Sequence, residues 1–235
     1  MSDRIMWLDR VTSTQDVTHE LAAAGAEDGE AVVAVEQTAG RGSRGRAWAS
    51  GRGGLWLSVL CRPTAAAPPE ALSIRVALAV AAALEAAGAA GIMVKWPNDL
   101  MISGRKVGGI LAEARWVGDR LGWIAIGVGI NVANTLPDEL RDVAATVGDR
   151  LPGARASDLA PAIIAAVRAA GSVAGPLDPA EQGDFARRDA IVGRRLVAPV
   201  AGIAAGIAAD GALRVRRDDG VVEQVKVGPA VAVSL

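Results

Sequence analysis

The chain is poor in the residues that most often act as nucleophiles or metal ligands, since its 235 residues include one cysteine and one histidine. The single cysteine, Cys61, excludes an internal disulfide and a metal site built from cysteine pairs. The single histidine, His19, excludes a histidine cluster around a metal, and any Ser–His or Cys–His catalytic pair would have to use it. Tyrosine is absent, and the aromatic residues are six tryptophans and one phenylalanine.

A surplus of positive charge and a long hydrophobic run are also missing. The formal net charge of −1 argues against a nonspecific polyanion binder, because neutralising phosphates takes extra lysine and arginine. The longest apolar run, residues 76–84, is about half a membrane span, and no basic-then-apolar leader opens the chain. Half of the residues are apolar (51%), which is typical of a globular protein with a sizeable core. We expect a cytoplasmic protein without a membrane segment.

Hydrophobic patterning predicts mixed α and β structure. Helices are predicted over residues 14–24, 68–87, 157–170 and 179–188, with Ser157 as the N-cap of the third. Strands are predicted over residues 31–36, 55–60, 92–95, 100–102, 107–115 and 121–132. After Asp189, short β-type runs alternate with glycine turns, which predicts a small all-β unit packed on the main domain. We therefore expect two domains, residues 1–188 and 189–235.

The most informative local feature is the loop at residues 40–46, which reads Gly-Arg-Gly-Ser-Arg-Gly-Arg. The glycines let the backbone approach an anion, and the arginines offer guanidinium groups suited to phosphate or carboxylate. The loop lacks the Gly-Lys-Ser/Thr of a P-loop, and no Gly-x-Gly-x-x-Gly pattern opens a helix here. It predicts phosphate binding, although an arginine-rich chain also places arginine freely in connecting loops.

Lysine is scarce, because only Lys95, Lys106 and Lys226 stand against an otherwise all-arginine set of basic residues. A lysine retained in such a chain indicates a need for a compact ammonium group, with chance as the alternative for so small a number. Lys95 and Lys106 both lie between residues 95 and 111, in a stretch that contains Lys-Trp-Pro-Asn-Asp and Arg-Lys-Val-Gly-Gly-Ile-Leu.

Five segments together resemble the biotin–protein ligase family in order and spacing. They are Thr12-Ser13-Thr14-Gln15, the glycine–arginine loop within residues 36–48, Lys95-Trp96-Pro97-Asn98-Asp99, residues 105–113 and Gly127-x-Gly129-Ile130-Asn131-Val132. The match covers the chain to about residue 134, and residues 192–235 resemble the family's small C-terminal domain. The resemblance implies an α+β fold, with a mixed β-sheet flanked by helices in a class II synthetase-like catalytic domain and an SH3-like β-barrel at the C-terminus.

The resemblance also implies the activity. It indicates an ATP-dependent ligase that activates biotin as biotinyl-5′-AMP and transfers the biotinyl group to a lysine of a biotin carboxyl carrier protein domain. ATP and biotin would be substrates, and Mg²⁺ would be held through the phosphates, with no metal ligands assigned in the chain. A carboxylate that attacks a phosphate brings two anions together, so positioned cations supply most of the help and no protein nucleophile is needed.

The site residues implied by the resemblance fall into two sets. Biotin would be bound by Ser13, Thr14, Gln15, Gln37, Arg41, Gly42, Ser43, Lys106, Gly109, Ile110 and Leu111. ATP and the adenylate would be bound by Arg44, Arg46, Trp48, Asn98, Asp99, Gly127, Val128, Gly129 and Asn131. Lys106 and Arg41 would be the catalytic cations, with Lys106 at the reacting carboxylate and α-phosphate. Asp99 is a candidate for the magnesium or the acceptor-lysine side, and Trp48 for stacking on adenine or covering biotin.

Two positions depart from the family's usual pattern, and the N-terminus bears on DNA binding. Ser43 stands where a basic residue is usual, so one positive charge on the phosphate is missing or is supplied by Arg44. Gln15 stands where asparagine is commoner. Met1 lies about a dozen residues before the Ser13 motif, which leaves no room for the DNA-binding helix-turn-helix of some members. We expect a ligase that binds no DNA, as a monomer or a homodimer.

Two other functions remain as alternatives. A lipoate-type acyltransferase of the same superfamily would use a cysteine nucleophile, but Cys61 ends a predicted buried strand and has no histidine in a matching motif. A non-catalytic ligand-binding relative would have lost Lys106 or Arg41, and both are present. His19 lies outside the motifs and is predicted to be a surface or helix-face residue.

Overall fold

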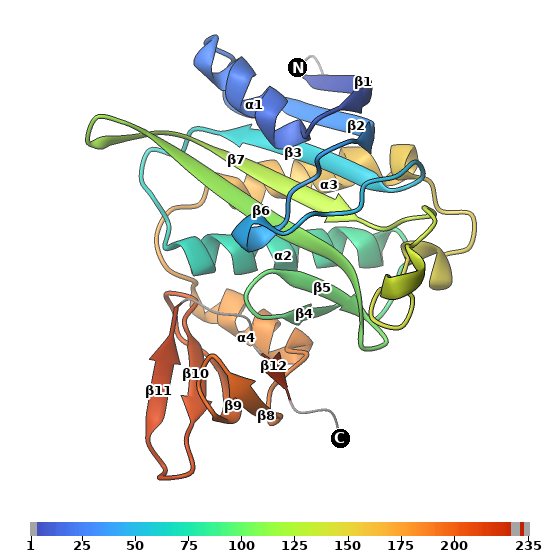
Figure 1. The fold of residues 1–235 in the computed structure, drawn as a ribbon. Helices are drawn as coiled ribbons and strands as arrows, with labels where there is room; N and C mark the ends of the chain where they lie inside the picture. The colour runs from blue at the N-terminus through green and yellow to red at the C-terminus, as the bar shows by residue number, and fades with distance from the viewer. Residues whose placement is uncertain (1–3, 227–230, 233–235) are drawn as a thin grey trace.

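The computed structural model describes residues 4–226 and 231–232 (Figure 1). Its larger sheet has seven strands in the order β1-β2-β3-β7-β6-β5-β4. These strands are β1 (Ile5–Val11), β2 (Ala31–Gln37), β3 (Leu55–Cys61), β4 (Met93–Lys95), β5 (Asp99–Ile102), β6 (Arg105–Val117) and β7 (Arg120–Ile130). The pair β1 and β2 is parallel and the other neighbours are antiparallel, so the sheet is mixed, as predicted.

Four helices accompany the sheet: α1 (Thr14–Ala23), α2 (Pro69–Ala86), α3 (Ala156–Gly171) and α4 (Pro179–Arg188). Alternation along β7 shows that α1 and α3 cover opposite faces, because consecutive strand residues point to opposite sides. A Cβ on Gly127 would meet Gln15 of α1. The side chain of the neighbouring Ile126 lies against Gly171 at the end of α3. Figure 1 shows α2 and α3 running side by side behind the sheet. None of the described helices is long and apolar enough to cross a bilayer.

Helix α2 is the most buried helix, and one charged residue fixes it to the chain that follows α3. Pro69 and Glu70 begin the helix, at positions where a missing N–H and a negative charge are both tolerated. Arg75 in its middle is only 4% exposed. Its guanidinium donates to the carboxylate of Glu181 and to backbone carbonyls of Val173, Gly175 and Pro176, which satisfies a charge that burial alone would penalise.

The predicted helices and strands of the main domain are all present, with two corrections. Strand β1 was missed, because its side chains do not alternate between buried and exposed and Met6 and Trp7 face solvent. Ser157 is not the N-cap of α3, which begins at Ala156 after an Arg155 cap that makes no side-chain bond. The Ser157 hydroxyl lies inside the first turn and donates to the carboxylate of Asp158 instead.

The C-terminal unit is a small antiparallel sheet in the order β11-β10-β9-β8-β12. Its strands are β8 (Arg195–Ala198), β9 (Gly202–Ile207), β10 (Leu213–Arg216), β11 (Val222–Val225) and β12 (Val231–Ala232). Within the described residues β11 and β12 end the order, so the sheet is not closed into the predicted barrel. The indole N–H of Trp96 donates to the Gly211 carbonyl at 2.9 Å, a buried bond between the main domain and this sheet.

Candidate active site

A cavity of about 710 Å³ lies on the face of the large sheet that α1 covers, within the usual size range for small-molecule sites. All the predicted site residues except one line it. From the N-terminal half they are Ser13, Thr14, Gln15, Gln37, Arg41, Gly42, Ser43, Arg46 and Trp48. From the central strands they are Asn98, Asp99, Lys106, Gly109, Ile110, Leu111, Gly127, Val128, Gly129 and Asn131. The exception is Arg44, which is exposed and has a φ of 62°.

Three glycines on paired strands make the floor of the cavity. Gly109 of β6 lies opposite Gly129 of β7, and Gly127 lies opposite Leu111, so the three glycines face the same side of the sheet. A Cβ on Gly127 would stand 3.1 Å from Gln15 Cδ, and one on Gly129 would stand 2.7 Å from Trp48 Nε1. Gly127 and Gly129 therefore leave little room for a side chain, because Gln15 and Trp48 lie directly on the backbone there, whereas a Cβ on Gly109 would make an ordinary contact with Lys106 at 3.5 Å.

The N-terminus of α1 points polar groups at one end of the cavity. Ser13 is the N-cap, and its hydroxyl accepts from the backbone N–H of Gln15 at 3.3 Å. The N–H of Thr14 donates to Gln37 Oε1 at 2.8 Å, and the Thr14 hydroxyl lies 2.8 Å from that of Ser58. Burial and these bonds hold the predicted biotin-binding side chains in one arrangement.

Gln15 crosses from α1 to the two central strands. Its Nε2 donates to the carbonyls of Leu111 and Ala125, at 3.1 and 3.3 Å. Its Oε1 is buried and has no hydrogen-bond partner among the described residues. Because buried polar atoms are almost always paired, this oxygen is an acceptor that a ligand N–H could use.

The glycine–arginine loop folds back on itself as a compact turn. The N–H of Gly42 donates to the Arg46 carbonyl at 2.8 Å, and Arg41 pairs with Ala47 across the turn. The guanidinium of Arg46 donates to the hydroxyl and carbonyl oxygen of Ser43, at 3.3 and 3.4 Å. Arg46 is thus the loop arginine that stands beside Ser43 at the cavity, whereas Arg44 lies outside it.

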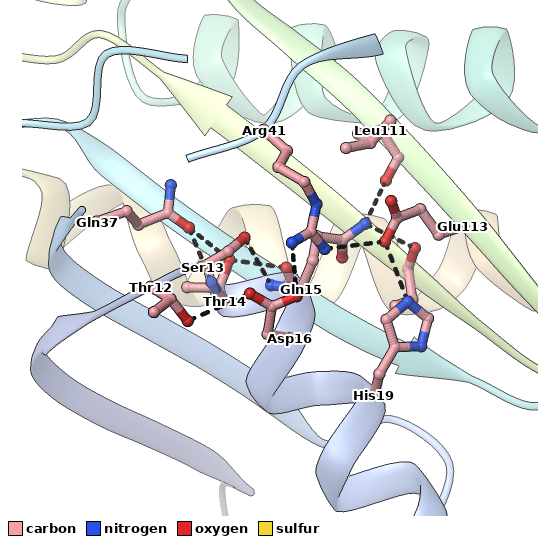
Figure 2. A network of polar contacts seen from close by, with 12 residues as sticks. Thr12, Ser13, Thr14, Gln15, Asp16, His19, Gln37, Arg41, Leu111 and Glu113 are labelled. Atoms are coloured by element: carbon pink, nitrogen blue, oxygen red, sulfur yellow. Dashed lines mark hydrogen bonds and ion pairs between the residues drawn. The ribbon is translucent and has the colours of Figure 1, made fainter. Parts of the chain in front are cut away.

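Arg41 lies between two carboxylates, as Figure 2 shows. Its Nη1 is 2.5 Å from Asp16 Oδ1 and its Nη2 is 3.3 Å from Glu113 Oε2. Partial burial works to lower the pKa of Arg41, but the hydrogen bond that Arg41 donates to Asp16 and the charges of Glu113 and Asp16 outweigh it and raise that pKa. Arg41 is a permanent cation whose position is fixed from two sides.

Lys106 lies at the other side of the cavity against Asp99 and Trp48. Its Nζ is 2.5 Å from Asp99 Oδ1 and 4.9 Å from the centre of the Trp48 ring. Its backbone bonds to the segment that follows β7, with its N–H donating to Val143 at 2.8 Å and its carbonyl accepting from Ala145 at 2.9 Å. The Trp48 indole nitrogen is buried without a hydrogen-bond partner in the described part of the chain.

Asn98 and Asn131 line the cavity but use their side chains to shape its walls. The Nδ2 of Asn98 donates to the Ile110 carbonyl at 2.6 Å, while the N–H of Ile110 donates to the Asn98 carbonyl at 2.9 Å. The Oδ1 of Asn131 accepts from Asn134 at 3.2 Å. Both residues therefore hold backbone turns against the site.

The structure adds residues that sequence reasoning missed. Asp16 and Glu113 accept hydrogen bonds from Arg41 and fix its position. Neither was predicted as a site residue, although Glu113 lies in one of the motifs that resemble the family. His19 lies on helix α1, as predicted, but it is not a surface residue, because its side chain is only 12% exposed and it bonds to Glu113. Lys95 and Arg194 also line the cavity, the latter from the C-terminal unit. The contacts around Arg41 join residues distant in sequence, so no local pattern indicated those contacts, whereas Lys95 lies in the quoted Lys-Trp-Pro-Asn-Asp motif.

Cys61 does not line the cavity. It lies in β3 against Gly171, and burial raises the pKa of its thiol to about 12, with a further contribution from Asp28. A buried thiol that stays protonated at neutral pH is not a nucleophile. The prediction that Cys61 is an inert core residue is therefore supported.

Comparison with known sequences finds one family model, the biotin/lipoate A/B protein ligase family, over residues 7–131. The bifunctional ligase/repressor BirA of Bacillus subtilis is 41% identical over 153 residues, which cover 63% of this chain and 47% of that protein. The biotin–[acetyl-CoA-carboxylase] ligase of Mycobacterium tuberculosis is 40% identical over 144 residues, covering 57% and 52%. The chain thus spans about half the length of these curated relatives.

Solved structures match over almost the whole chain. The biotin protein ligase from Aquifex aeolicus in complex with biotin and ATP superposes with a TM-score of 0.81 at 26% identity, covering 95% of this chain and 96% of that one. The Leishmania major biotin protein ligase in complex with biotinyl-5-AMP gives a TM-score of 0.67 at 28% identity, covering 94% and 98%.

Proposed function

Because the chain belongs to the biotin/lipoate A/B protein ligase family, we propose that it is an ATP-dependent biotin–protein ligase. It joins biotin to ATP as biotinyl-5′-AMP and transfers the biotinyl group to a lysine of a biotin carboxyl carrier protein domain. The observation that supports this most directly is the cavity itself. Arg41, Lys106 and the unpaired acceptor of Gln15 meet there over a floor of glycines.

Recognition of biotin needs polar groups for its ureido ring and a cation for its carboxylate. Gln15 Oε1 accepts a ureido N–H, and the Ser13 hydroxyl, whose oxygen already accepts from the Gln15 N–H, donates its proton to the ureido oxygen. Thr14 lines the same end of the cavity with its hydroxyl proton on Gln37 Oε1. Arg41 faces the carboxylate with the guanidinium protons that Asp16 and Glu113 leave free, since a guanidinium has five N–H donors. The remaining biotin residues, Gln37, Gly42, Ser43, Gly109, Ile110 and Leu111, enclose the ligand.

In the first step a carboxylate oxygen of biotin bonds to the α-phosphorus of ATP, and the bond to the bridging oxygen breaks to release pyrophosphate. Lys106 stabilises the charge that develops there, in a site where fixed cations are worth more than in water. Trp48 and Arg46, with Gly127, Val128, Gly129, Asn98 and Asn131, form the nucleotide side. Arg44, which is exposed, contributes to the positive field of the loop and not to a direct contact.

Mg²⁺ would be held mainly through the ATP phosphates. Among the described residues no group of three or more His, Cys, Asp or Glu side chains could hold a metal. Asp99, whose carboxylate lies beside Lys106, is the one predicted site residue with a carboxylate, an oxygen ligand that suits Mg²⁺. The ion would neutralise phosphate charge.

In the second step the amine of the acceptor lysine bonds to the acyl carbon, AMP leaves with the bonding electrons, and the amine releases a proton to solvent. Asp99 is our candidate for the group that faces this lysine. We further propose that the chain divides into a catalytic unit, residues 1–188, and a C-terminal unit, residues 189–235, equivalent to the family's SH3-like domain. The separate sheets of the two units support this division.

The test is exchange of labelled pyrophosphate into ATP, with biotin, lipoate or octanoate as the acid. A biotin–protein ligase supports exchange with biotin alone. Exchange with lipoate or octanoate and not biotin would assign the chain to the lipoate ligases of the family, and acyl transfer without ATP would assign it to the acyltransferases. Binding of biotin without exchange would indicate a non-catalytic relative.

A further inference from the structure

The single histidine lies at the centre of a polar network behind Arg41 (Figure 2). His19 Nε2 is 3.1 Å from Glu113 Oε2, and its Nδ1 accepts from the indole N–H of Trp123 at 2.9 Å. The same oxygen of Glu113 accepts from Arg41 Nη2 at 3.3 Å. One carboxylate oxygen is thus shared by the histidine and by the cation that lines the cavity.

The indole N–H determines the tautomer of this histidine. Tryptophan is only a donor, so Nδ1 must present its lone pair and the proton of the neutral ring is on Nε2. The Nε2 proton points at the Glu113 carboxylate, which accepts it in a hydrogen bond. Two partners from β6 and β7 therefore fix both the ring orientation and the tautomer of a residue on α1.

Glu113 needs such support, because its side chain has three rotatable bonds and is 26% exposed. Holding a long side chain in one rotamer costs conformational entropy. His19, at 12% exposed and packed on Trp123, is the more rigid of the two. A fixed Glu113 then limits where the Arg41 guanidinium can lie, with Asp16 as the second limit.

We propose that His19 is a positioning residue for Arg41, acting through Glu113. This deepens the proposed function, since it rests on Arg41 binding the carboxylate or phosphate of the substrates. His19 touches no ligand itself. It fixes the carboxylate that fixes the cation, so its removal weakens substrate binding without removing a reacting group.

Two substitutions separate the two bonds of His19. In His19→Asn the amide oxygen takes the place of Nδ1 and keeps the Trp123 bond, but no donor reaches Glu113. In His19→Gln the amide nitrogen takes the place of Nε2 and keeps the donor to Glu113, but the Trp123 N–H loses its acceptor. Glu20→Gln is the matched control, because Glu20 is exposed on the same helix.

We expect His19→Asn to raise the KM for biotin in pyrophosphate exchange about tenfold, because the charged Glu113 carboxylate loses a hydrogen bond that fixes its position. The kcat should change less than the KM. The KM values of His19→Gln and Glu20→Gln should stay within about twofold of the wild-type KM. In a Glu113→Gln background, His19→Asn should add nothing further. Thermal unfolding identifies any variant that is merely destabilised.

The opposite pattern, with His19→Gln impaired and His19→Asn active, would show that His19 serves only to hold Trp123. Equal loss in both variants, or additive effects with Glu113→Gln, would also overturn the proposal. A second readout is independent of activity. Because His19 is the only histidine, a long-range ¹H–¹⁵N spectrum of the ¹⁵N-histidine-labelled protein reports its tautomer without assignment. We expect the neutral ring to be the Nε2–H tautomer, and an Nδ1–H ring would contradict the geometry even if the proposed reaction were wrong.

Discussion

The cations in the cavity are held in different ways. Arg41 has two carboxylate partners, whereas Lys106 has one, Asp99, and the face of Trp48. An ammonium with three rotatable donors can leave Asp99 and follow a charge as it develops, while a guanidinium fixed at two nitrogens cannot. This difference suits Arg41 to binding and Lys106 to the reaction itself.

Lys106→Ala should therefore lower the rate of biotin-dependent pyrophosphate exchange ~10²–10³-fold, the usual cost of removing one preorganised charge from a transition state. The fold should be retained, because water can solvate the Asp99 carboxylate once its lysine partner is removed. Lys226→Ala is the control, since Lys226 pairs with Asp210 in the C-terminal unit and does not line the cavity. Exchange at the wild-type rate in Lys106→Ala would remove Lys106 from the mechanism.

Ser43 offers a test of the glycine–arginine loop. If a basic residue at this position holds the adenylate, Ser43→Arg adds one charge-assisted bond worth about 1.5 kcal/mol or more and slows release of biotinyl-AMP about tenfold. Arg46→Ala should speed release, because Arg46 lies beside Ser43 at the cavity, and Arg44→Ala should be silent. A stopped-flow chase that follows tryptophan fluorescence measures the rates. A larger effect from Arg44→Ala than from Arg46→Ala would contradict this assignment.

Most of the cavity could be predicted from short motifs, because loop glycines, Gln15, Lys106 and the Asn98 turn all lie in segments that resemble the family. The network behind Arg41 could not be predicted. His19 and its partner Glu113 are 94 residues apart, and His19 and Trp123 are 104 apart. Only the pairing of β6 with β7, under α1, brings them together, and no local periodicity encodes that contact.

The helices and strands also differ in how well the local sequence predicts them. Buried strands such as β3 and the apolar helix α2 were predicted because burial on all sides leaves a continuous apolar run. Strand β1 was missed because it is an edge strand with an irregular burial pattern. Ser157 was taken for an N-cap from its residue type, although the extended backbone that makes the cap is at Arg155, two residues earlier.

The contact between α3 and the sheet gives a prediction for stability. A Cβ on Gly171 would stand 2.6 Å from Cys61 Sγ and 2.8 Å from Ile126 Cδ1, both in the core. Gly171→Ala should therefore lower the free energy of unfolding by about 1–3 kcal/mol, the usual cost of overpacking.

The control is Gly183→Ala in α4, where the nearest atom to a new Cβ is the flexible end of Arg187 at 3.8 Å. Because glycine inside a helix is unfavourable, this substitution should raise the free energy of unfolding by about 0.5–1 kcal/mol. Urea unfolding measures both variants. Equal stability of the two would mean that α3 does not pack against β3 and β7 as described.

The two sheets are joined at a site motif. Trp96, within Lys-Trp-Pro-Asn-Asp, is buried and donates to Gly211, and its core is continuous with Leu196, Leu213 and Val215 of the C-terminal unit. That unit also places Arg194 on the cavity. The sequence predicted a small β unit from its glycine turns, but neither its contact with Trp96 nor its contribution to the cavity follows from local patterns.

In the reaction proposed above, the chain attaches biotin to a carrier lysine through an adenylate. The most direct measurement is intact-mass analysis of a biotin carboxyl carrier domain after incubation with the protein, biotin and Mg-ATP. We expect a gain of one biotinyl group that requires ATP, is lost when the acceptor lysine is replaced, and is lost with Lys106→Ala. An unmodified carrier, or a gain that does not depend on ATP, would contradict the account.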